Sequence, residues 1–378
     1  MTQTPRPAGQ RRAGEKRDIV VYSDPEAYAS FPQLVRTNSE LVLLFQVQEL
    51  AKLRAASKHP HYQAFAVPRW ASSRDGGLTW ARHDTCPPLG AVEDISYGSV
   101  ALADGGTVTL TFSSSEAMQA IIEHGSIGYR PYQQVRQADG NVALPVSDIG
   151  PFSRFYPHGM TRTSAGKLIA AGYAPMTDGT GRTTAVFLVS EDEGRTWRTL
   201  SHIQNTERFS FSEPAIIETR DGRLLTLLRV DWDPVPAEER PDAARVGYGY
   251  YLYRSWSADG GRNWEAPERL PIWGHPPYLL RLRSGSLLLV YGHRREPYGI
   301  RAALSRDEGQ TWDPAGIRTV HRFDPGSYDL GYPVATQLAD GSIVCAYYGY
   351  ATTDVGETMP HAIFVSVFDE AWLTASSS

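Results

Sequence analysis

SEDEGRTW, the stretch from Ser190 to Trp197, follows the pattern Ser-x-Asp-x-Gly-x-Thr-Trp. Three more copies begin at Ser73, Ser257 and Ser305, and the copy at Ser257 has asparagine in place of threonine. In each copy the aspartate can accept hydrogen bonds from turn amides, the glycine can adopt a positive φ, and the tryptophan can pack beneath the turn. We therefore expect four tight turns between strands, with a structural role and a position far from any active site.

A second pattern recurs six times: a proline or glycine, an apolar strand, a turn about eight residues further on, and a second apolar strand. The copies align at steps of 66, 60, 56, 63 and 56 residues, with the following residues in register: Pro32, Gly98, His158, Pro214, Pro277 and Pro333. A glycine that tolerates positive φ lies in most of the turns, so each copy predicts a β-hairpin. The strands are apolar without strict alternation, which predicts burial on both faces.

Six hairpins at similar spacing predict an all-β fold, a six-bladed β-propeller in which four blades carry the Ser-x-Asp turns. We expect one propeller domain over residues 18–378, after a disordered tail of residues 1–17. The apolar strand 19–22 is expected to pair with the strand 362–367 in one blade, which would close the ring and remove exposed edges. The one helical stretch, residues 47–57, is interpreted as a loop insertion.

Composition argues against several classes of partner. The formal charge is −5, and no dense run of Lys and Arg could follow a phosphate backbone, so a nucleic-acid partner is not expected. No apolar segment reaches the length of a signal peptide or a membrane span, which predicts a cytoplasmic protein without a membrane partner. Cys86 and Cys345 are too few for a disulfide framework and are expected to be buried. We expect no cofactor, and the oligomeric state stays open.

In a propeller the first strand of each blade lines a central channel, and the residues that lead into these strands converge at one end of it. The aligned positions, called the mouth residues below, are Phe31, Tyr97, Pro157, Glu213, Pro276 and Tyr332. His158 follows directly after one of them. This ring contains one carboxylate and two phenols, and it is the first place to look for chemistry.

The four Ser-x-Asp turns resemble the Asp-box (BNR) repeats of the sialidase superfamily, whose members form six-bladed propellers. The likeness runs from about Asp18 to about Phe368. Sialidases use a tyrosine nucleophile, which a glutamate activates. The segment with Glu213 and Arg229 resembles the family segment that carries this glutamate and one substrate-binding arginine. Likewise, the segment 329–333 resembles the one that carries the nucleophile, which makes Tyr332 the matching residue.

A third segment, residues 291–301, resembles a stretch of uncharacterised Asp-box proteins in which an arginine can point at the ligand. Arg294 or Arg295 could supply this arginine, because a guanidinium fork binds a carboxylate through two hydrogen bonds. The alternative is a surface charge pair with Glu296.

Two departures from the sialidase pattern affect the expected substrate. Ser30 lies where sialidases carry the first of three carboxylate-binding arginines, and the loss of such a pair costs on the order of 1.5–3 kcal/mol. In the loop where the family carries its acid/base aspartate, the sequence has His59 and His61 instead. A histidine can transfer protons near neutral pH, a His-x-His pair could also bind a metal but lacks further ligands, and a plain loop is the third interpretation.

Asp94 and His158 are further candidates near the mouth, although either could be a simple turn residue. The leading hypothesis is an exo-acting glycoside hydrolase for a sialic-acid-like, acidic or deoxy sugar other than ordinary sialic acid. In it Tyr332 is the nucleophile, Glu213 its base, His61 the acid/base, and Arg229 and Arg294 bind the substrate. A uronic-acid lyase and a non-catalytic carbohydrate-binding propeller are the alternatives. The sugar and the stereochemical outcome stay open.

Overall fold

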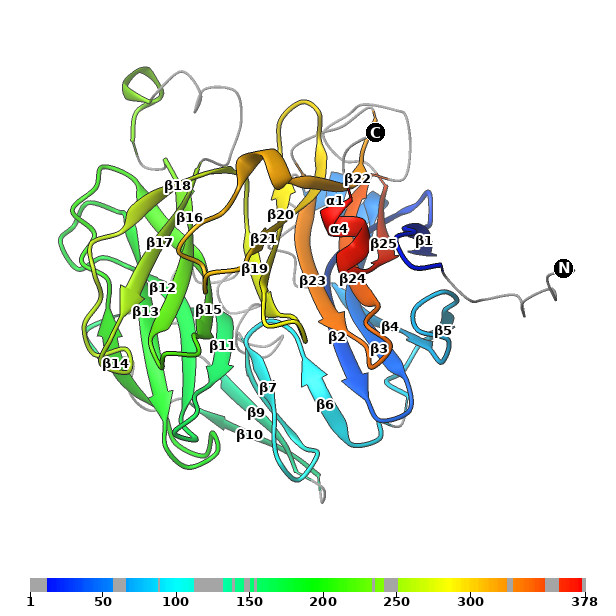
Figure 1. Cartoon of the computed structure of the whole chain (residues 1–378), viewed down its shortest axis with the longest axis horizontal. Helices are drawn as coiled ribbons and strands as arrows, with labels where there is room; N and C mark the ends of the chain where they lie inside the picture. Colours follow the sequence, from blue (N-terminus) through cyan, green and yellow to red (C-terminus); the bar gives the residue numbers. More distant parts are fainter. Residues whose placement is uncertain are drawn as a thin grey trace, which may run out of the picture.

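The computed structural model describes residues 12–56, 66–87, 89–111, 132–137, 140–145, 150–152, 155–232, 235–240, 251–324, 329–350 and 360–375. Nearly all regular structure in these ranges is β-strand, as predicted (Figure 1). The helices are short: α1 (Leu50–Ala56), η2 (Ala237–Glu239), η3 (Pro314–Gly316) and α4 (Glu370–Thr374). No helix in the described ranges is long and apolar enough to span a membrane.

Four sheets contain four antiparallel strands each, in chain order. Their strands are β7 (Ser99–Ala101), β8 (Thr107–Thr111), β9 (Tyr132–Gln137) and β10 (Gly140–Pro145); β11 (Tyr156–Arg162), β12 (Leu168–Pro175), β13 (Thr183–Ser190) and β14 (Arg198–His202); β15 (Ser210–Glu218), β16 (Leu224–Asp231), β17 (Tyr251–Ser257) and β18 (Glu268–Trp273); β19 (Pro277–Arg281), β20 (Leu287–His293), β21 (Gly299–Ser305) and β22 (Arg318–Arg322). Each sheet starts with a strand of the predicted hairpin pattern.

A fifth sheet of nine strands joins the two ends of the chain. Its strands are β1 (Arg17–Tyr22), β2 (Ala27–Thr37), β3 (Leu41–Glu49), β4 (Val67–Ser73), β5 (Ala81–His83), β6 (Val92–Ile95), β23 (Gly331–Gln337), β24 (Ile343–Tyr350) and β25 (His361–Phe368). The early and late strands meet at one parallel pair, Tyr28 opposite His361. β1 pairs with β25, with Ile19 opposite Val365, so the predicted pairing of the two terminal strands is confirmed.

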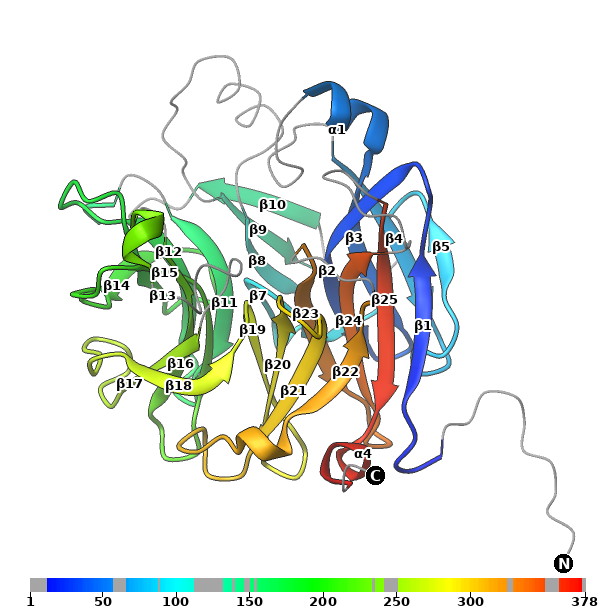
Figure 2. The same ribbon diagram turned by 90° about the horizontal axis from the view of Figure 1, so that it is seen from above.

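The first strands of the hairpins, β2, β7, β11, β15, β19 and β23, lie toward the middle of the molecule (Figures 1 and 2). Each contacts the next: β7 contacts β11, β11 contacts β15, β15 contacts β19, β19 contacts β23, and β23 contacts β2. β6 pairs with β2 and contacts β7, which completes the series. The mouth residues therefore come from neighbouring strands even where they are far apart in the sequence.

Four of the six mouth residues share an unusual backbone conformation. The pairing register shifts at the start of four inner strands, next to Phe31, Pro157, Glu213 and Tyr332. Four mouth residues have positive φ: Phe31 (53°), Tyr97 (37°), Glu213 (42°) and Tyr332 (46°). A bulge with a left-handed residue redirects a side chain at a cost of about 1–3 kcal/mol. The repeated distortion thus brings side chains of different strands to the same end of the inner strands.

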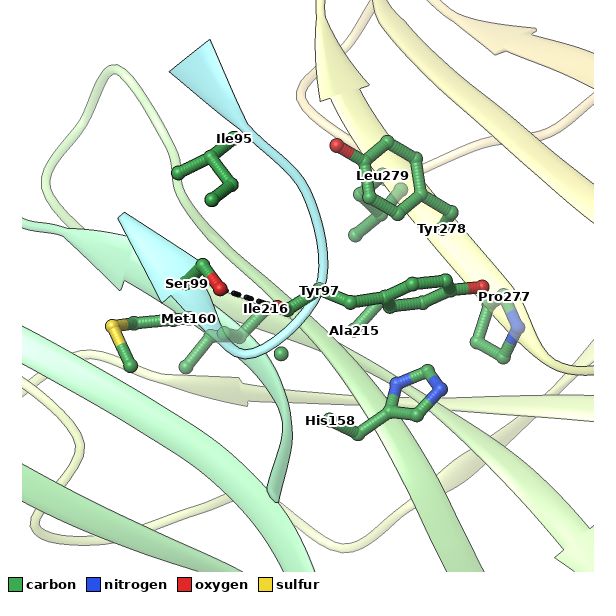
Figure 3. A pocket seen from close by; sticks show the side chains of 11 residues that line it. Ile95, Tyr97, Ser99, His158, Met160, Ala215, Ile216, Pro277, Tyr278 and Leu279 are labelled. Carbon is green, nitrogen blue, oxygen red and sulfur yellow. Dashed lines mark hydrogen bonds between the residues drawn. The ribbon is translucent and has the colours of Figure 1, made fainter. Parts of the chain in front are cut away.

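Between the inner strands lies a cavity of about 60 Å³ (Figure 3). Residues of β6, β7, β11, β15 and β19 line it, among them His158 and Tyr278, together with Tyr97 between β6 and β7. The Tyr97 hydroxyl donates a hydrogen bond to the Pro333 carbonyl oxygen at 3.0 Å. The Tyr97 side chain therefore links the cavity wall to β23 next to Tyr332.

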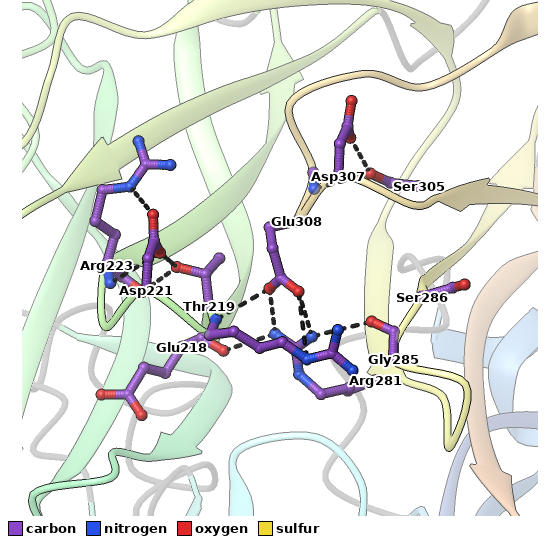
Figure 4. Close-up of polar contacts among 12 residues, drawn as sticks. Glu218, Thr219, Asp221, Arg223, Arg281, Gly285, Ser286, Ser305, Asp307 and Glu308 are labelled. Atoms are coloured by element: carbon purple, nitrogen blue, oxygen red, sulfur yellow. Dashed lines mark hydrogen bonds and ion pairs between the residues drawn. The ribbon is translucent and has the colours of Figure 1, made fainter.

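The four Ser-x-Asp turns lie between the third and fourth strands of their hairpin series, after β4, β13, β17 and β21. In the turn at Ser190, the Ser190 hydroxyl donates to Asp192 at 2.8 Å and accepts from the Gly194 amide at 2.8 Å. The same two hydrogen bonds occur in the turns at Ser73, Ser257 and Ser305, and Figure 4 shows Ser305 with Asp307. In each turn the serine and aspartate side chains thus bond to groups of the same turn and fix its conformation.

One set of polar contacts between neighbouring inner strands lies at the ends that are remote from the mouth residues. Arg281 pairs with Glu308 through Nη1 and Nη2, at 2.9 and 2.7 Å, and Nη2 also donates to the Glu218 carbonyl oxygen (Figure 4). At these ends, hydrogen bonds connect five of the six neighbouring pairs in the series: Arg162 to Ala101, Ser164 to Glu218, Arg281 to Glu218, Arg283 to Gln337, and Arg36 to Thr336. These five contacts are called the remote belt below. The sixth pair, β2 and β7, is joined nearer the mouth by the hydrogen bond from Gln33 to Ser99.

Two sequence expectations need correction. Cys345 is buried, but Cys86 is exposed, because it lies in the loop after the short outer strand β5. The helical stretch is shorter than predicted: residues 47–49 complete β3, and α1 begins at Leu50. Leu50 and Leu53 are nearly fully buried in the core cluster beneath β2 and β3, so α1 packs on the fold rather than only decorating a loop.

Candidate active site

The structure brings Glu213 and Tyr332 together, as the aligned hairpins predicted. The Tyr332 hydroxyl donates a hydrogen bond to one carboxylate oxygen of Glu213, although 119 residues separate the two in the chain. Arg229 on β16 donates to the other Glu213 oxygen at 2.7 Å and lies 3.4 Å from the Tyr332 hydroxyl oxygen. A phenol, a carboxylate and a guanidinium thus form one hydrogen-bonded group at the mouth.

Burial and charge determine the protonation of this group. Glu213 is only 8% exposed, and burial alone would raise its pKa, but Arg229, His158 and the Tyr332 hydroxyl together lower the pKa of Glu213 to about 2. Burial and the charge of Glu213 raise the pKa of Tyr332 far above its usual value. At neutral pH the pair is therefore a carboxylate that accepts a hydrogen bond from a neutral phenol.

The Nε and Nη2 edge of the Arg229 guanidinium faces Asp231. Arg229 Nε and Nη2 lie 2.9 and 2.8 Å from Asp231 Oδ1, and the Ser212 hydroxyl donates to the other Asp231 oxygen. Arg229 thus forms ion pairs with the carboxylates of Glu213 and Asp231, so its main described contacts are within the site. Sequence reasoning missed Asp231, although residues i and i+2 of a strand share a face and Asp231 follows Arg229 at that spacing.

Arg294, directly after β20, lies on another side of Tyr332. Its side chain is 4% exposed, and its Cζ lies 5.7 Å from the Tyr332 ring centroid. Nε and Nη2 are buried and have no hydrogen-bond partner among the described residues. These two nitrogens form one edge of the guanidinium, the edge that binds a carboxylate in a bidentate manner. Arg295 instead lies over the Trp273 ring at 4.3 Å, so of the two predicted arginines only Arg294 contacts Tyr332.

His158 on β11 also borders the site, and its ring packs against Tyr97 with centroids 4.7 Å apart (Figure 3). His158 Nδ1 lies 3.4 Å from the Pro214 carbonyl oxygen, and because a carbonyl only accepts, Nδ1 carries the proton. Burial lowers the pKa of His158, against the opposite effect of Glu213. Nε2 is therefore a neutral acceptor, buried and without a partner among the described residues.

Not every predicted site residue joins this group. Asp94 accepts a hydrogen bond from the Thr336 hydroxyl, four residues beyond Tyr332 on β23, and so lies further along the inner strands than the mouth residues. β6 carries Asp94 there because it pairs with β2. Ser30 is fully buried, and its hydroxyl oxygen has no partner in the described ranges. His59 and His61 lie outside the described residues, so their predicted roles stay predictions.

Aromatic side chains complete the surroundings, and sequence reasoning named Phe31 among them as a mouth residue but missed Tyr173 and Tyr348. Burial and the charge of Glu213 raise the pKa of Tyr173, which stacks on Tyr156 with centroids 4.8 Å apart. Tyr348 stacks on Tyr332 at 6.0 Å, and Phe31 packs edge-on against it at 4.8 Å. No cluster of His, Cys, Asp and Glu among the described residues could hold a metal ion.

Comparison with known proteins supports this interpretation of the fold. Residues 158–345, which include Glu213, Arg229, Arg294 and Tyr332, match the BNR repeat-like domain family. This match supports the predicted resemblance to the sialidase and BNR-repeat superfamily. No curated protein sequence matches the chain.

Solved structures share the fold at low sequence identity. A protein of unknown function from Dyadobacter fermentans is 24% identical, with a TM-score of 0.71 over 94% of this chain and 99% of that chain. The leech intramolecular trans-sialidase, complexed with 2,7-anhydro-Neu5Ac, is 13% identical, with a TM-score of 0.61 over 95% of this chain and 70% of that one. The intramolecular trans-sialidase from Ruminococcus gnavus, in complex with oseltamivir carboxylate, is also 13% identical, with a TM-score of 0.57 over 95% and 98%.

Proposed function

We propose that this chain is a six-bladed sialidase-like propeller that hydrolyses the terminal glycosidic bond of an acidic or deoxy sugar. In this proposal the four four-stranded sheets are blades, and the nine-stranded sheet contributes two more, built on β2 to β5 and on β23 to β25 with β1. The Ser-x-Asp turns are its Asp boxes. The complete series of contacts among the inner strands supports a count of six.

The hydrogen bond from Tyr332 to Glu213 is the observation that carries the proposal. The Tyr332 oxygen attacks the anomeric carbon while Glu213 accepts the phenolic proton, and the bond from that carbon to the leaving oxygen breaks. A tyrosine nucleophile suits an anionic substrate, because a carboxylate nucleophile would repel it. The leaving oxygen needs a proton from an acid, and His61 remains our candidate for this role. Water then cleaves the tyrosyl intermediate.

Arg294 is our first candidate for binding the acidic group of the substrate, because its free edge matches a planar carboxylate. Arg229 supports catalysis chiefly by keeping Glu213 ionised, and any contact it makes with the substrate comes from its remaining N–H. Ser30 in place of a third arginine weakens carboxylate binding, which favours a sugar other than ordinary sialic acid. His158 Nε2 can accept a hydrogen bond from a substrate hydroxyl.

A panel of acidic aryl glycosides tests this function, with release of the aryl group as the readout. We expect turnover by the wild-type protein and a decrease of kcat/KM by about 10²-fold or more in Glu213→Gln and Tyr332→Phe. Glu308→Gln, which changes a Glu–Arg pair of the remote end, is the matched control and should retain activity. Unchanged turnover in Glu213→Gln would contradict the mechanism.

A uronic-acid lyase is the second candidate, favoured by the free acceptor nitrogen of His158 beside Tyr332 and Arg294. In that reaction a base removes the proton next to the carboxylate, the leaving oxygen departs, and a double bond forms. The product is unsaturated and absorbs in the near ultraviolet, so the spectrum of the products separates elimination from hydrolysis. Binding of acidic oligosaccharides without any product would instead favour a non-catalytic carbohydrate-binding propeller.

A further inference from the structure

A second polar group lies next to the candidate active site, around the carboxylate of Asp329. Asp329 precedes β23 by two residues. Its Oδ2 accepts a hydrogen bond from the Tyr28 hydroxyl at 3.0 Å, and its Oδ1 accepts one from the Tyr348 hydroxyl at 2.9 Å. His361 Nε2 lies 2.9 Å from the Asp329 carbonyl oxygen. The group thus joins residues of β2, β24 and β25.

The chemistry of this group keeps both phenols as donors. Tyr28 and Tyr348 are fully buried, and burial together with the charge of Asp329 raises the pKa of each well above its usual value. A neutral phenol that donates to a carboxylate makes a charge-assisted hydrogen bond, which is stronger than one between two neutral groups. Asp329 therefore holds the two tyrosine hydroxyls at fixed positions.

Tyr348 transmits this restraint to Tyr332. The two rings are nearly parallel, with an interplanar angle of 25° and centroids 6.0 Å apart. The Tyr348 ring is fixed at both ends, by its backbone in β24 and by its hydroxyl at Asp329. Phe31 packs edge-on against Tyr332 on a further side, and Arg294 lies over the Tyr332 ring. The plane of the Tyr332 ring is thus defined by its neighbours.

Tyr332 needs such a restraint because its backbone is strained. With φ at 46° it occupies a conformation that residues with side chains rarely adopt, and such residues persist where the surrounding structure holds them. The Asp329 group lies at the junction where β2 meets β25, since Tyr28 is paired with His361. The same side chains therefore join the early and late strands of the nine-stranded sheet and orient Tyr332.

We propose that Asp329 is a positioning residue for Tyr332 and acts through Tyr348. This proposal rests on the proposed function of Tyr332 as a nucleophile. Asp329 does not contact the reacting atoms; it fixes the Tyr348 hydroxyl, and the Tyr348 ring then holds the Tyr332 oxygen at the angle that attack on an anomeric carbon requires. A misplaced nucleophile lowers the rate of the chemical step more than it weakens substrate binding.

The test compares Asp329→Asn and Tyr348→Phe with Tyr347→Phe. Tyr347 is the matched control because it precedes Tyr348 on β24, is equally buried, and hydrogen-bonds to the Ser366 hydroxyl at 2.7 Å, on the opposite face of the strand from Tyr332. We expect kcat on an acidic aryl glycoside to decrease about 10- to 100-fold in Asp329→Asn and Tyr348→Phe, with KM changed by less than about threefold. Tyr347→Phe should lower the Tm but keep the wild-type kcat.

The double variant Asp329→Asn/Tyr348→Phe should be no slower than the slower single variant, because both changes interrupt the same connection. Equal losses of kcat in Tyr347→Phe, or wild-type kcat in Asp329→Asn, would overturn the proposal. Crystal structures of the variants give a readout that needs no substrate. A rotated Tyr332 ring in Asp329→Asn supports the positioning role even if no glycoside is turned over, whereas an unmoved ring contradicts it.

Discussion

Arg294 is the residue that the fold explains least without a ligand. A buried cation whose donors are unfilled destabilises a protein unless another interaction compensates for it. Arg294 contacts the Tyr332 ring, but its Nε and Nη2 find no acceptor among the described residues. An anionic ligand group would supply one, so the position of Arg294 fits a binding role better than a structural one.

Replacing Arg294 should therefore separate binding from stability. In Arg294→Met we expect the affinity for an acidic sugar to decrease about 10- to 100-fold, the value of one charge-assisted pair. The Tm should stay the same or rise, because an unpaired buried charge is removed. Arg295→Met is the control and should bind within about threefold of the wild type. Calorimetric titration and thermal unfolding check both effects, and a large decrease of the Tm in Arg294→Met contradicts this view.

Glu213 gives the stability a defined pH dependence. Its folded-state pKa of about 2 lies below the ordinary value of 4.5, so the ionised form stabilises the fold above pH 4.5 and this stabilisation is lost as the pH decreases through 2. A shift of this size corresponds to on the order of 3 kcal/mol. The Tm difference between the wild type and Glu213→Gln should be largest above pH 5 and disappear near pH 2. A constant difference across this range contradicts the assigned pKa.

At the residue scale, the sequence predicted site residues that occupy equivalent positions in the repeats and missed those that lie outside these positions. Glu213 and Tyr332 were found because they occupy equivalent positions in two hairpins, and the structure brings them into contact. Asp329 lies outside the aligned positions, and its two phenol partners come from distant strands. Asp94 was expected at the mouth because it lies three residues before Tyr97, but β6 pairs with β2 and places Asp94 opposite Arg36, further along the strand.

At the element scale, two features repeat: the distorted start of the inner strand and the Ser-x-Asp turn. Glycine turns and apolar strands predicted the hairpins well. The bulges were not predicted, because a positive φ at Phe31, Tyr97, Glu213 and Tyr332 has no signal in the residue types, which rarely adopt it. Only the alignment of the copies indicated that these positions are equivalent.

The turn aspartates should affect stability but not catalysis. Asp192 accepts hydrogen bonds from Ser190 Oγ at 2.8 Å and from Thr196 N and Oγ1 at 2.8 and 2.6 Å. In Asp192→Ala these donors lose their acceptor, so the free energy of unfolding should decrease by about 1–3 kcal/mol while kcat stays unchanged. Asp84→Ala is the control, because the Asp84 side chain is 93% exposed and lies 3.6 Å from Arg69 Nε, and it should change stability by less than about 0.5 kcal/mol. Denaturant unfolding measures both, and a loss of kcat in Asp192→Ala contradicts a purely structural role.

At the scale of the whole molecule, two sets of contacts hold the series of inner strands together. The remote belt and the Gln33–Ser99 hydrogen bond link each inner strand to the next, and the nine-stranded sheet joins the first strands to the last. The sequence predicted the pairing of the two terminal strands from the apolar segments at both ends of the chain. It could not predict the remote belt, since its partners, such as Ser164 and Glu218, are single residues with no shared pattern.

Removal of residues 1–22 tests the contribution of β1 to closure. β1 pairs with β25, and Asp18 accepts hydrogen bonds from Ser366 at 2.6 Å and from His321 at 3.4 Å. We expect the truncated protein to unfold at a Tm lower by several degrees, because these contacts are lost along a whole strand edge. Removal of residues 1–11 alone, within the predicted tail, is the control and should leave the Tm unchanged. An unchanged Tm without β1 contradicts its role in closure.

The most direct test of the central claim is a crystal structure of the wild-type protein soaked with a sugar acid. The account predicts that the carboxylate of the sugar lies within about 3 Å of Arg294 Nε and Nη2. It also predicts that the anomeric carbon lies next to the Tyr332 hydroxyl oxygen, with Glu213 behind it. A sugar bound elsewhere on the molecule, with the edge of Arg294 unoccupied, would contradict the account.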